Sequence, residues 1–306
     1  MCKAPDRLDI ETRQQAMHLI GLLIPGCDIC AQLDKGLLMT TSPDAWVYGD
    51  FAPDPDSRDL VGLKARWLLE QIPAMDAPLV LDYGAGEGKH LHLVRKYKPR
   101  ARLVGVDIRE AHGAVDFEFH RVAPNASLPL ADDAYDLVIS CDVLEHVDNI
   151  EHSLDEIHRV LRSGGSFIGF VPAEGGIGAH AFFRFLDPNI YRDTKDHGHA
   201  YTRRELLQSL SSRFRVERLA YSYHLIGATL DAAFFASFKV PRFGSRMEEF
   251  WRGQENDFYR AREPESKPSV VGRLVRLANR AAYYESRLLK NVSLGAKGLH
   301  FHVVKR

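Results

Sequence analysis

Short apolar runs alternate with stretches of helical periodicity along the middle of the chain, and no other feature constrains the fold as strongly. The runs lie at 79–83, 101–107, 117–122, 135–140 and 166–171, and most are apolar throughout rather than at every second residue. Strands of this kind are buried on both faces, as in a parallel sheet covered by its crossover helices. The sequence therefore predicts an α/β fold with helices on both faces of the sheet.

Residues at helical spacing fill the intervals between these runs. The interval 149–162 carries an apolar face, and Gly164–Gly165 are predicted to end that helix. A loop rich in glycine and histidine is predicted after Pro172, followed by a helix near 202–212 and a strand at 214–224.

Four parts of the chain differ in their pattern. Residues 1–55 form a mixed N-terminal extension, and residues 56–224 carry the alternating core. Residues 225–293 are mainly helical and are predicted to form an insertion or lid, while residues 294–306 supply the final strand. The helical insertion thus precedes the last strand.

A glycine-rich segment, VLDYGAGEGKH at 80–90, follows the first apolar run. Glycine lets the backbone turn sharply and approach a ligand closely, and the next helix offers free amide groups. The dinucleotide fingerprint would need glycine at Lys89, and the phosphate-binding loop would need glycine at Tyr83 and a hydroxyl residue at His90. Two interpretations remain: a nucleotide loop led by an acid, or a tight turn without a ligand.

A second acidic residue, Asp107, ends the next apolar run about twenty residues beyond the loop. A carboxylate at this place can accept hydrogen bonds from both ribose hydroxyls of an adenosine and would repel a 2′-phosphate. The alternative is a turn or capping residue.

Two further motifs, LPLADDAYDLVISCDVLEHV at 128–147 and LRSGGSFIGFVP at 161–172, complete the pattern. Together with the glycine loop and Asp107 they resemble the type 11 family of class I methyltransferases, which use S-adenosylmethionine (SAM). The resemblance spans roughly Asp56 to Tyr223. It implies SAM as the cofactor and a Rossmann-like, seven-stranded, mostly parallel sheet whose last strand, at 298–306, runs antiparallel.

The resemblance also implies which residues hold SAM. Asp82 and the loop would hold its methionine end, Asp107 its ribose, and Asp142 the nearby wall. The family's usual acid before the L-P-F stretch is replaced here by Pro124 and Asn125, so Asn125 or a backbone group would meet the adenine edge. The expected cofactor contacts are Asp82, Gly84, Ala85, Gly86, Gly88, Asp107, Ile108, Asn125 and Asp142.

Methyl transfer needs few catalytic side chains, because SAM already carries the reactive group. The candidates are Glu145 and His146 after the fourth strand and His199 in the loop before 202–212. A histidine with a near-neutral pKa suits a general base for a hydroxyl acceptor. Alternatively, Glu145 and His146 cap the next helix, or they hold a divalent ion with Asp142, and His199 is an ordinary surface residue. We predict no resident metal.

The insertion carries two notable sets of side chains. Phe234, Phe235 and Phe238 are predicted to pack within it or to line an apolar acceptor pocket. Four arginines share one helical face, with apolar residues opposite, the two sets being only roughly segregated; a solvated face is the favoured interpretation, and contact with a lipid surface or an anionic substrate is the alternative. The arginines are Arg273, Arg276, Arg280 and Arg287, and the opposite residues are Val271, Leu274, Val275, Leu277, Ala278 and Leu288.

Composition limits the classes of partner and the cellular compartment that we expect. The net charge of −1 gives no basic excess, which disfavours a nucleic acid. Cys27 and Cys30 form a C-x-x-C without a second pair, so ordinary thiols are expected rather than a zinc site. The charged N-terminus and the lack of a long apolar run favour a cytoplasmic protein.

The sequence thus predicts a SAM-dependent methyltransferase acting on a small-molecule or lipid-like acceptor, with peripheral membrane contact left open. Two alternatives belong to other classes: a nucleic-acid methyltransferase that uses the arginine helix, and a module that binds SAM without transferring methyl groups. The oligomeric state does not follow from the sequence.

Overall fold

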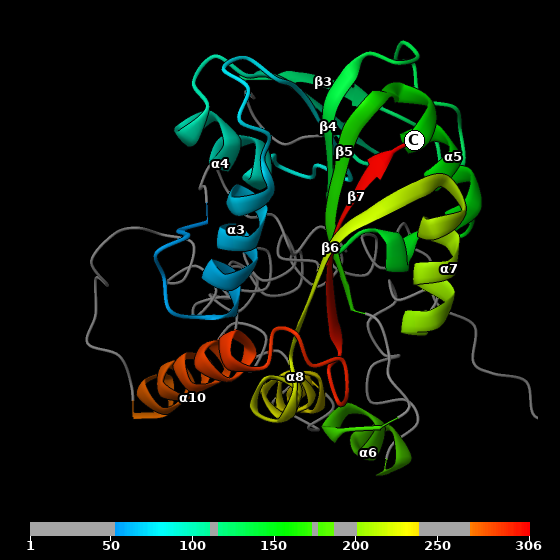
Figure 1. The fold of residues 1–306 in the computed structure, drawn as a ribbon. Coiled ribbons are helices and arrows are strands. Elements are labelled where there is room, and N and C mark those ends of the chain that lie inside the picture. The colour runs from blue at the N-terminus through cyan, green and yellow to red at the C-terminus, as the bar shows by residue number, and fades with distance from the viewer. Residues whose placement is uncertain (1–52, 111–115, 173–176, 187–200, 239–269) are drawn as a thin grey trace, which may run out of the picture. The chain divides into compact units, whose positions relative to one another are not determined.

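The computed structural model describes residues 53–110, 116–172, 177–186, 201–238 and 270–306 (Figure 1). All of them lie in one compact unit of the chain that begins at Tyr48. The N-terminal extension and the C-x-x-C lie outside the described residues, apart from the last few residues of the extension.

Seven strands form a single sheet in the order β3-β2-β1-β4-β5-β7-β6. The first five are mutually parallel where they pair, and β7 runs antiparallel to both β5 and β6. The predicted sheet, with its antiparallel last strand, is therefore confirmed. The strands are β1 Leu79–Tyr83, β2 Arg102–Asp107, β3 Glu118–Arg121, β4 Tyr135–Cys141, β5 Leu161–Pro172, β6 Phe214–Ser222 and β7 Gly298–Lys305.

The strand order reverses between β1 and β4. From β1 the chain builds outward to β2 and β3, then returns to place β4 on the other side of β1. The two connections leave in opposite directions, which opens a crevice at the carboxyl ends of β1 and β4. The glycine loop and the segment after β4 both start at this crevice.

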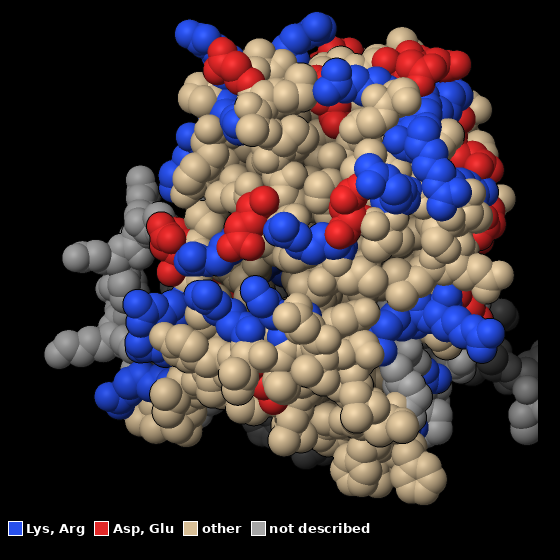
Figure 2. Space-filling view, in the orientation of Figure 1, with Lys and Arg blue, Asp and Glu red and all other residues tan. Residues whose placement is uncertain are grey.

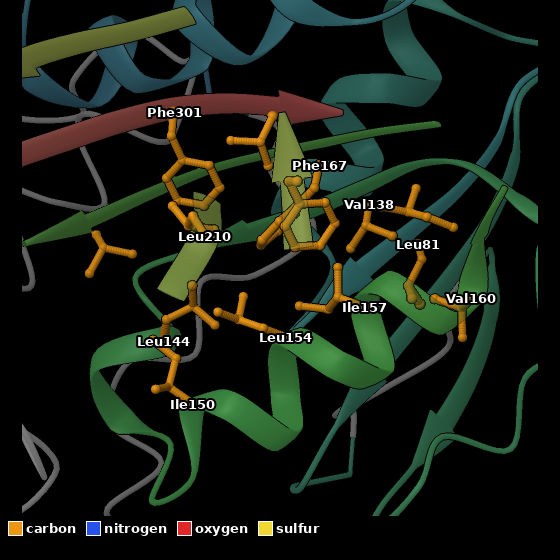
Figure 3. Packing of buried hydrophobic residues seen from close by; sticks show 14 of the residues in the cluster. Leu81, Val138, Leu144, Ile150, Leu154, Ile157, Val160, Phe167, Leu210 and Phe301 are labelled. Atoms are coloured by element: carbon orange, nitrogen blue, oxygen red, sulfur yellow. The ribbon is translucent and has the colours of Figure 1, made fainter. Parts of the chain in front are cut away.

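Helices cover both faces of the sheet, as the sequence predicts (Figure 1). Helices α3 and α4 pack on one face and α5 and α7 on the other. Successive strand residues point to opposite faces, so each face presents apolar side chains that its helices cover. Figure 3 shows the second face, where Leu154 and Ile157 lie against Leu81, Val138 and Phe167. The helices are α3 Leu60–Gln71, α4 Lys89–Tyr97, α5 Ile150–Val160, α6 Ala179–Leu186, α7 Arg203–Arg213, α8 Leu225–Phe238 and α10 Val270–Leu288, with a 3₁₀ turn, η1, at Leu144–His146.

Two local predictions are wrong. Gly164–Gly165 lie inside β5 rather than at the end of α5, since Leu161 already pairs with Tyr135 and an irregular register follows. Gly164 has a φ of +75°, which lets the strand bend there. The region expected to be a loop contains α6, because its apolar residues recur at helical spacing despite the flanking glycines.

Between β6 and β7 the chain forms α8 and α10, which pack against each other, while α6 packs against α8. The predicted segregation on α10 is wrong: Leu274 and Leu277 are 60% and 65% exposed and share the outer side with Arg273 and Arg280. The buried side of α10 consists mainly of small residues, such as Ala282, which allow close approach to its neighbours. No helix in the described ranges has the length and apolar content needed to span a bilayer.

Candidate functional site

The glycine loop follows β1 and places three glycines in left-handed conformations. Gly84, Gly86 and Gly88 have φ angles of +82°, +52° and +80°. A Cβ on Gly84 would lie 2.4 Å from a methyl of Val143, and one on Gly88 would lie 2.3 Å from the Phe117 ring. A Cβ on Gly86 would meet nothing within 4 Å. The loop is therefore packed at both ends and open in the middle, where a ligand can approach the backbone.

Asp82 lies directly under this loop at the end of β1. The side chain is fully buried, and neither carboxylate oxygen has a hydrogen-bond partner among the described residues. The nearest basic atom is Nδ1 of His90, 3.5 Å away. A buried, uncompensated carboxylate is unfavourable, so this position fits a ligand that carries positive charge, as SAM does.

Asp107 ends β2 and joins the loop to that strand. One of its oxygens accepts a hydrogen bond from Gly86 N and the other from Arg109 N, both at 2.9 Å. Each oxygen keeps a second lone pair, so the carboxylate can still accept hydrogen bonds from ribose hydroxyls. Ile108 beside it is 54% exposed and presents an apolar surface at the mouth of the site.

Asp142 follows β4 and is held by a residue that the sequence analysis missed. Nζ of Lys64, on α3, lies 2.8 Å from both carboxylate oxygens of Asp142 and 3.8 Å from the centre of the Phe170 ring. Burial opposes both charges, but each partner more than offsets it, so the pKa of Lys64 is raised and that of Asp142 is lowered. The pair stays ionised across the physiological range.

Glu145 lies in η1, immediately beyond Asp142. Its side chain is buried, and one of its oxygens has no hydrogen-bond partner in the described part of the chain. Burial first, and then the charge of Asp142, raise the pKa of Glu145 to about 8. Nε2 of His146 lies 3.9 Å from the other carboxylate oxygen. This group therefore exchanges a proton near neutral pH.

The interpretation of Glu145 and His146 as helix caps is wrong. The N-cap of α5 is Asn149, whose side chain accepts a hydrogen bond from the backbone of His152. A short side-chain oxygen at the N-cap satisfies a free amide, which a buried glutamate four residues earlier does not reach.

A group of neutral, largely buried side chains at the end of β6 and on β7 was also not predicted from the sequence. Nε2 of His300 lies 2.9 Å from Oγ of Ser222, and the His300 ring lies 4.7 Å from that of Phe170. Burial, and then the nearby Lys64, lower the pKa of His300 to about 3. Tyr223, near Lys64, has its pKa raised to about 12 by burial. Both side chains are therefore uncharged at neutral pH.

The remaining predicted residues lie at the margin of the site or outside the described ranges. Asn125 is exposed, with a φ of +56°, in the segment between β3 and β4. His199 and the side chains of Phe235 and Phe238 are not described, whereas Phe234 is partly buried. Within the described ranges, no three His, Cys, Asp or Glu side chains are placed to share a metal ion.

Comparison with known proteins agrees with this geometry. Residues 81–169 match a family described as "Methyltransferase domain". The trans-aconitate 2-methyltransferase of Azoarcus sp. (strain BH72) is 35% identical over 107 residues, which cover 33% of this chain and 42% of that protein. The malonyl-[acyl-carrier protein] O-methyltransferase of Hahella chejuensis is 33% identical over 96 residues, covering 29% and 34%. The rat mitochondrial arginine-hydroxylase NDUFAF5 is 31% identical over 101 residues, covering 31% and 29%.

The matched part of the chain thus spans less than half of each curated relative. The family match, residues 81–169, nevertheless runs from β1 into β5 and contains the glycine loop, Asp107, Asp142 and Glu145. The strand order and the antiparallel last strand agree with it independently. Residues 81–169 thus match a methyltransferase domain, and they lie in a sheet of the strand order predicted for class I SAM-dependent methyltransferases.

Proposed function

We propose that the chain transfers a methyl group from SAM to a small-molecule or lipid-like acceptor. The observation that carries the proposal is the meeting, at the β1–β4 crevice, of an open glycine loop with the carboxylates of Asp107 and Asp142. SAM would supply a methyl group on a sulfonium, ready for in-line displacement. The protein then needs mainly to position the donor and the acceptor and to manage one proton.

The side chains divide this work. Asp82, Gly84, Ala85, Gly86 and Gly88 would hold the methionine end of SAM. Asp107 and Ile108 would hold the ribose side, with Asn125 facing the adenine. Asp142, kept ionised by Lys64, would form the charged wall between the cofactor and the acceptor.

Glu145 and His146 are the proposed proton acceptors. A carboxyl group with a pKa of about 8 is partly ionised at neutral pH and is matched to removing a proton from a hydroxyl acceptor. His146 is about one-third exposed and lies next to Glu145, so it can relay that proton to solvent. His199, outside the described ranges, stays a proposed alternative base.

The acceptor class is proposed from the names of relatives and from the charge of the chain. Two similar proteins are named for trans-aconitate and for malonyl-[acyl-carrier protein], which supports a small or acyl-type acceptor. The net charge of −1 offers no general attraction to a nucleic acid.

The experiment compares SAM binding by the wild-type protein and by Asp107→Ala in a calorimeter. Removing the carboxylate takes away two ribose acceptors and the contact to Gly86, so we expect the affinity to fall at least tenfold while the folded state persists. Asp76→Ala, which removes an exposed carboxylate paired with Arg100, serves as the control and should bind SAM normally. Equal affinity for Asp107→Ala and wild type would contradict the ribose assignment.

A second candidate function is SAM binding without methyl transfer. It is favoured by one observation, the similarity of 101 residues of the chain to a protein named as an arginine hydroxylase. Incubation with SAM labelled in its methyl group and a small-metabolite extract separates the two functions. A labelled product supports transfer, and tight SAM binding with no labelled product from any acceptor pool supports the second candidate.

A further inference from the structure

The helices between β5 and β7 carry most of the exposed apolar side chains in the described part of the chain. Outside these helices and the residues that adjoin them, the large exposed hydrophobic residues in the described ranges are only Tyr97, Ile108 and Val216. A soluble surface seldom gathers so many such side chains without a partner. The gathered residues are Ile177, Phe182, Phe185 and Leu186 around α6, Leu225 on α8, Val270, Leu274, Leu277, Tyr284 and Leu288 on α10, and Val292 and Leu294 after it.

On α10 these side chains form one continuous stripe. Val270, Leu274, Leu277, Tyr284 and Leu288 recur every three, four or seven residues, which places them on one side of the helix. Leu277 is 65% exposed and Leu288 is 83% exposed. The opposite side of α10 packs against α8 and α3. The stripe is therefore an outward face that α8 and α3 do not cover.

Arginines flank this stripe. Arg273 and Arg280 are exposed beside the leucines, and together with Arg276 and Leu277 they line a shallow hollow on the helix surface. Arg287 continues the row about two turns further along, where it contacts the hydroxyl of Tyr283. The apolar stems of these side chains can lie along the leucines while their charged ends reach a polar layer.

Acidic residues are scarce on the same helices, and those present are engaged. Asp231 on α8 pairs with Lys297, and Glu285 on α10 accepts hydrogen bonds from the first backbone amides of α8. Figure 2 shows the result: blue side chains run along α10, tan surface covers α6 and α8, and little red is visible at this end. The chain has a net charge of −1, but α6, α8 and α10 together carry a local excess of positive charge.

We infer that α10 and α6 dock this protein on the surface of an anionic lipid bilayer. Apolar side chains that can enter the acyl boundary, interleaved with arginines at the depth of the headgroups, are what an interfacial helix needs. A second copy of the chain fits less well, because a twofold contact would bring the arginine rows against each other. A nucleic acid would use the arginines but would leave the exposed leucines in water. This inference goes beyond the proposed methyl transfer and stands without it.

The test measures sedimentation of the full chain with vesicles of phosphatidylcholine alone and of phosphatidylcholine with about one third phosphatidylglycerol. We expect binding to the anionic vesicles only, weakened by salt. The double variant Arg273→Gln/Arg280→Gln should bind about 25-fold more weakly, since each surface charge contributes about fivefold. Arg100→Gln/Arg215→Gln removes two arginines from other surfaces and should change the affinity less than twofold.

The apolar stripe is tested separately with Leu277→Ser and Phe185→Ser, which alter side chains that are 65% and 84% exposed. Both variants should lose vesicle binding while keeping the thermal stability of the wild type, and Val216→Ser on β6 should keep both. The inference is overturned if the wild type ignores anionic vesicles, or if the control variants lose as much affinity as the α10 variants. Concentration-dependent dimers or RNA complexes without vesicle binding would overturn it as well.

Discussion

Lys64 and Asp142 show how single residues adjust the site. The ion pair joins α3 to the end of β4, and its side chains are 21% and 36% exposed. Loss of either partner leaves a partly buried charge without compensation, which costs more than the pair itself contributes. The pair is therefore a local structural constraint on the wall of the proposed cofactor site.

We predict that Lys64→Met and Asp142→Asn each lower the free energy of unfolding by about 1–2 kcal/mol, a modest value because water reaches both groups. The double variant should cost less than the sum of the two, since the second change removes the charge that the first one strands. Urea denaturation of the four proteins measures this coupling. Strict additivity would mean that the two charges do not stabilise each other.

The residues predicted from the sequence and the residues missed differ in one physical respect. Asp82, Gly84 and Asp107 could be placed because the contacts that matter join neighbours along the chain or adjacent parallel strands. Lys64 meets Asp142 across 78 residues, and Ser222 meets His300 across the same separation. Such pairs depend on how elements pack, and a helical lysine beside an apolar stripe looks like an ordinary surface residue in the sequence.

At the scale of elements, different glycines of the β1–α4 loop serve packing and the approach of a ligand. Gly84→Ala would combine a strained φ with a clash against Val143, and we expect it to cost about 3 kcal/mol or more. Gly86→Ala meets no neighbour within 4 Å, so it should cost only about 1 kcal/mol, from its left-handed backbone. Gly86→Ala should nevertheless weaken SAM binding, because the added methyl group enters the open side of the loop.

Thermal unfolding and SAM calorimetry on the two variants measure the expected effects on stability and on SAM binding separately. Gly86→Ala should melt close to the wild type but bind SAM poorly. If Gly86→Ala bound SAM as well as the wild type, the open side of the loop would not face the cofactor.

The start of α8 depends on a side chain from α10. The Glu285 carboxylate accepts hydrogen bonds from the amides of Leu225, Ile226 and Gly227, which an α-helix cannot satisfy from within. Its negative charge also interacts favourably with the positive end of the dipole of α8. The contact thus fixes α8 to α10.

We expect Glu285→Ala to lower the free energy of unfolding by about 2 kcal/mol. Hydrogen exchange of the first amides of α8 should become faster, while the amides of α5 keep their wild-type rates. Glu110→Ala, which removes an exposed carboxylate near β2, is the matched control. Unchanged exchange in α8 would show that the cap is dispensable.

Element identity was largely predictable, and its failures have clear causes. Apolar runs and helical spacing located the seven strands and most described helices, because burial imposes those periods directly. Gly164–Gly165 were assigned to a helix end, although the strand partner of Leu161 overrides that local signal. On α10 the period was right but the buried side was wrong, since the buried residues are not leucines but Gly272, Ala282, Tyr283 and Ser286.

At the scale of the whole molecule, the dependence of stability on pH reports on two buried groups, His300 and Glu145. Burial, followed by Lys64, lowers the pKa of His300 to about 3, below the value of about 6.5 in an unfolded chain. Between these values the unfolded chain holds the additional proton, so stability rises with pH and levels off near 6.5. Above that pH His300 no longer contributes to the slope.

Glu145 acts in the opposite direction. Its folded-state pKa of about 8 exceeds the value of about 4.3 for an unfolded glutamate, so the folded protein holds an additional proton between these values. Its contribution is complete below about 4.3 and declines as pH rises to about 8, by at most about 1.4 kcal/mol per pH unit. The window from about 6.5 to 8 therefore isolates Glu145 from His300.

We predict that the wild type loses unfolding free energy across this window and that Glu145→Gln, which cannot ionise, loses markedly less. Urea denaturation at several pH values between 6.5 and 8 gives the two curves, and their difference should widen steadily with pH. Glu87→Gln, an exchange on the glycine loop outside η1, should follow the wild type. If the curves of wild type and Glu145→Gln ran parallel, Glu145 would be ionised throughout the window, and its role as a proton acceptor near neutral pH would fall with it.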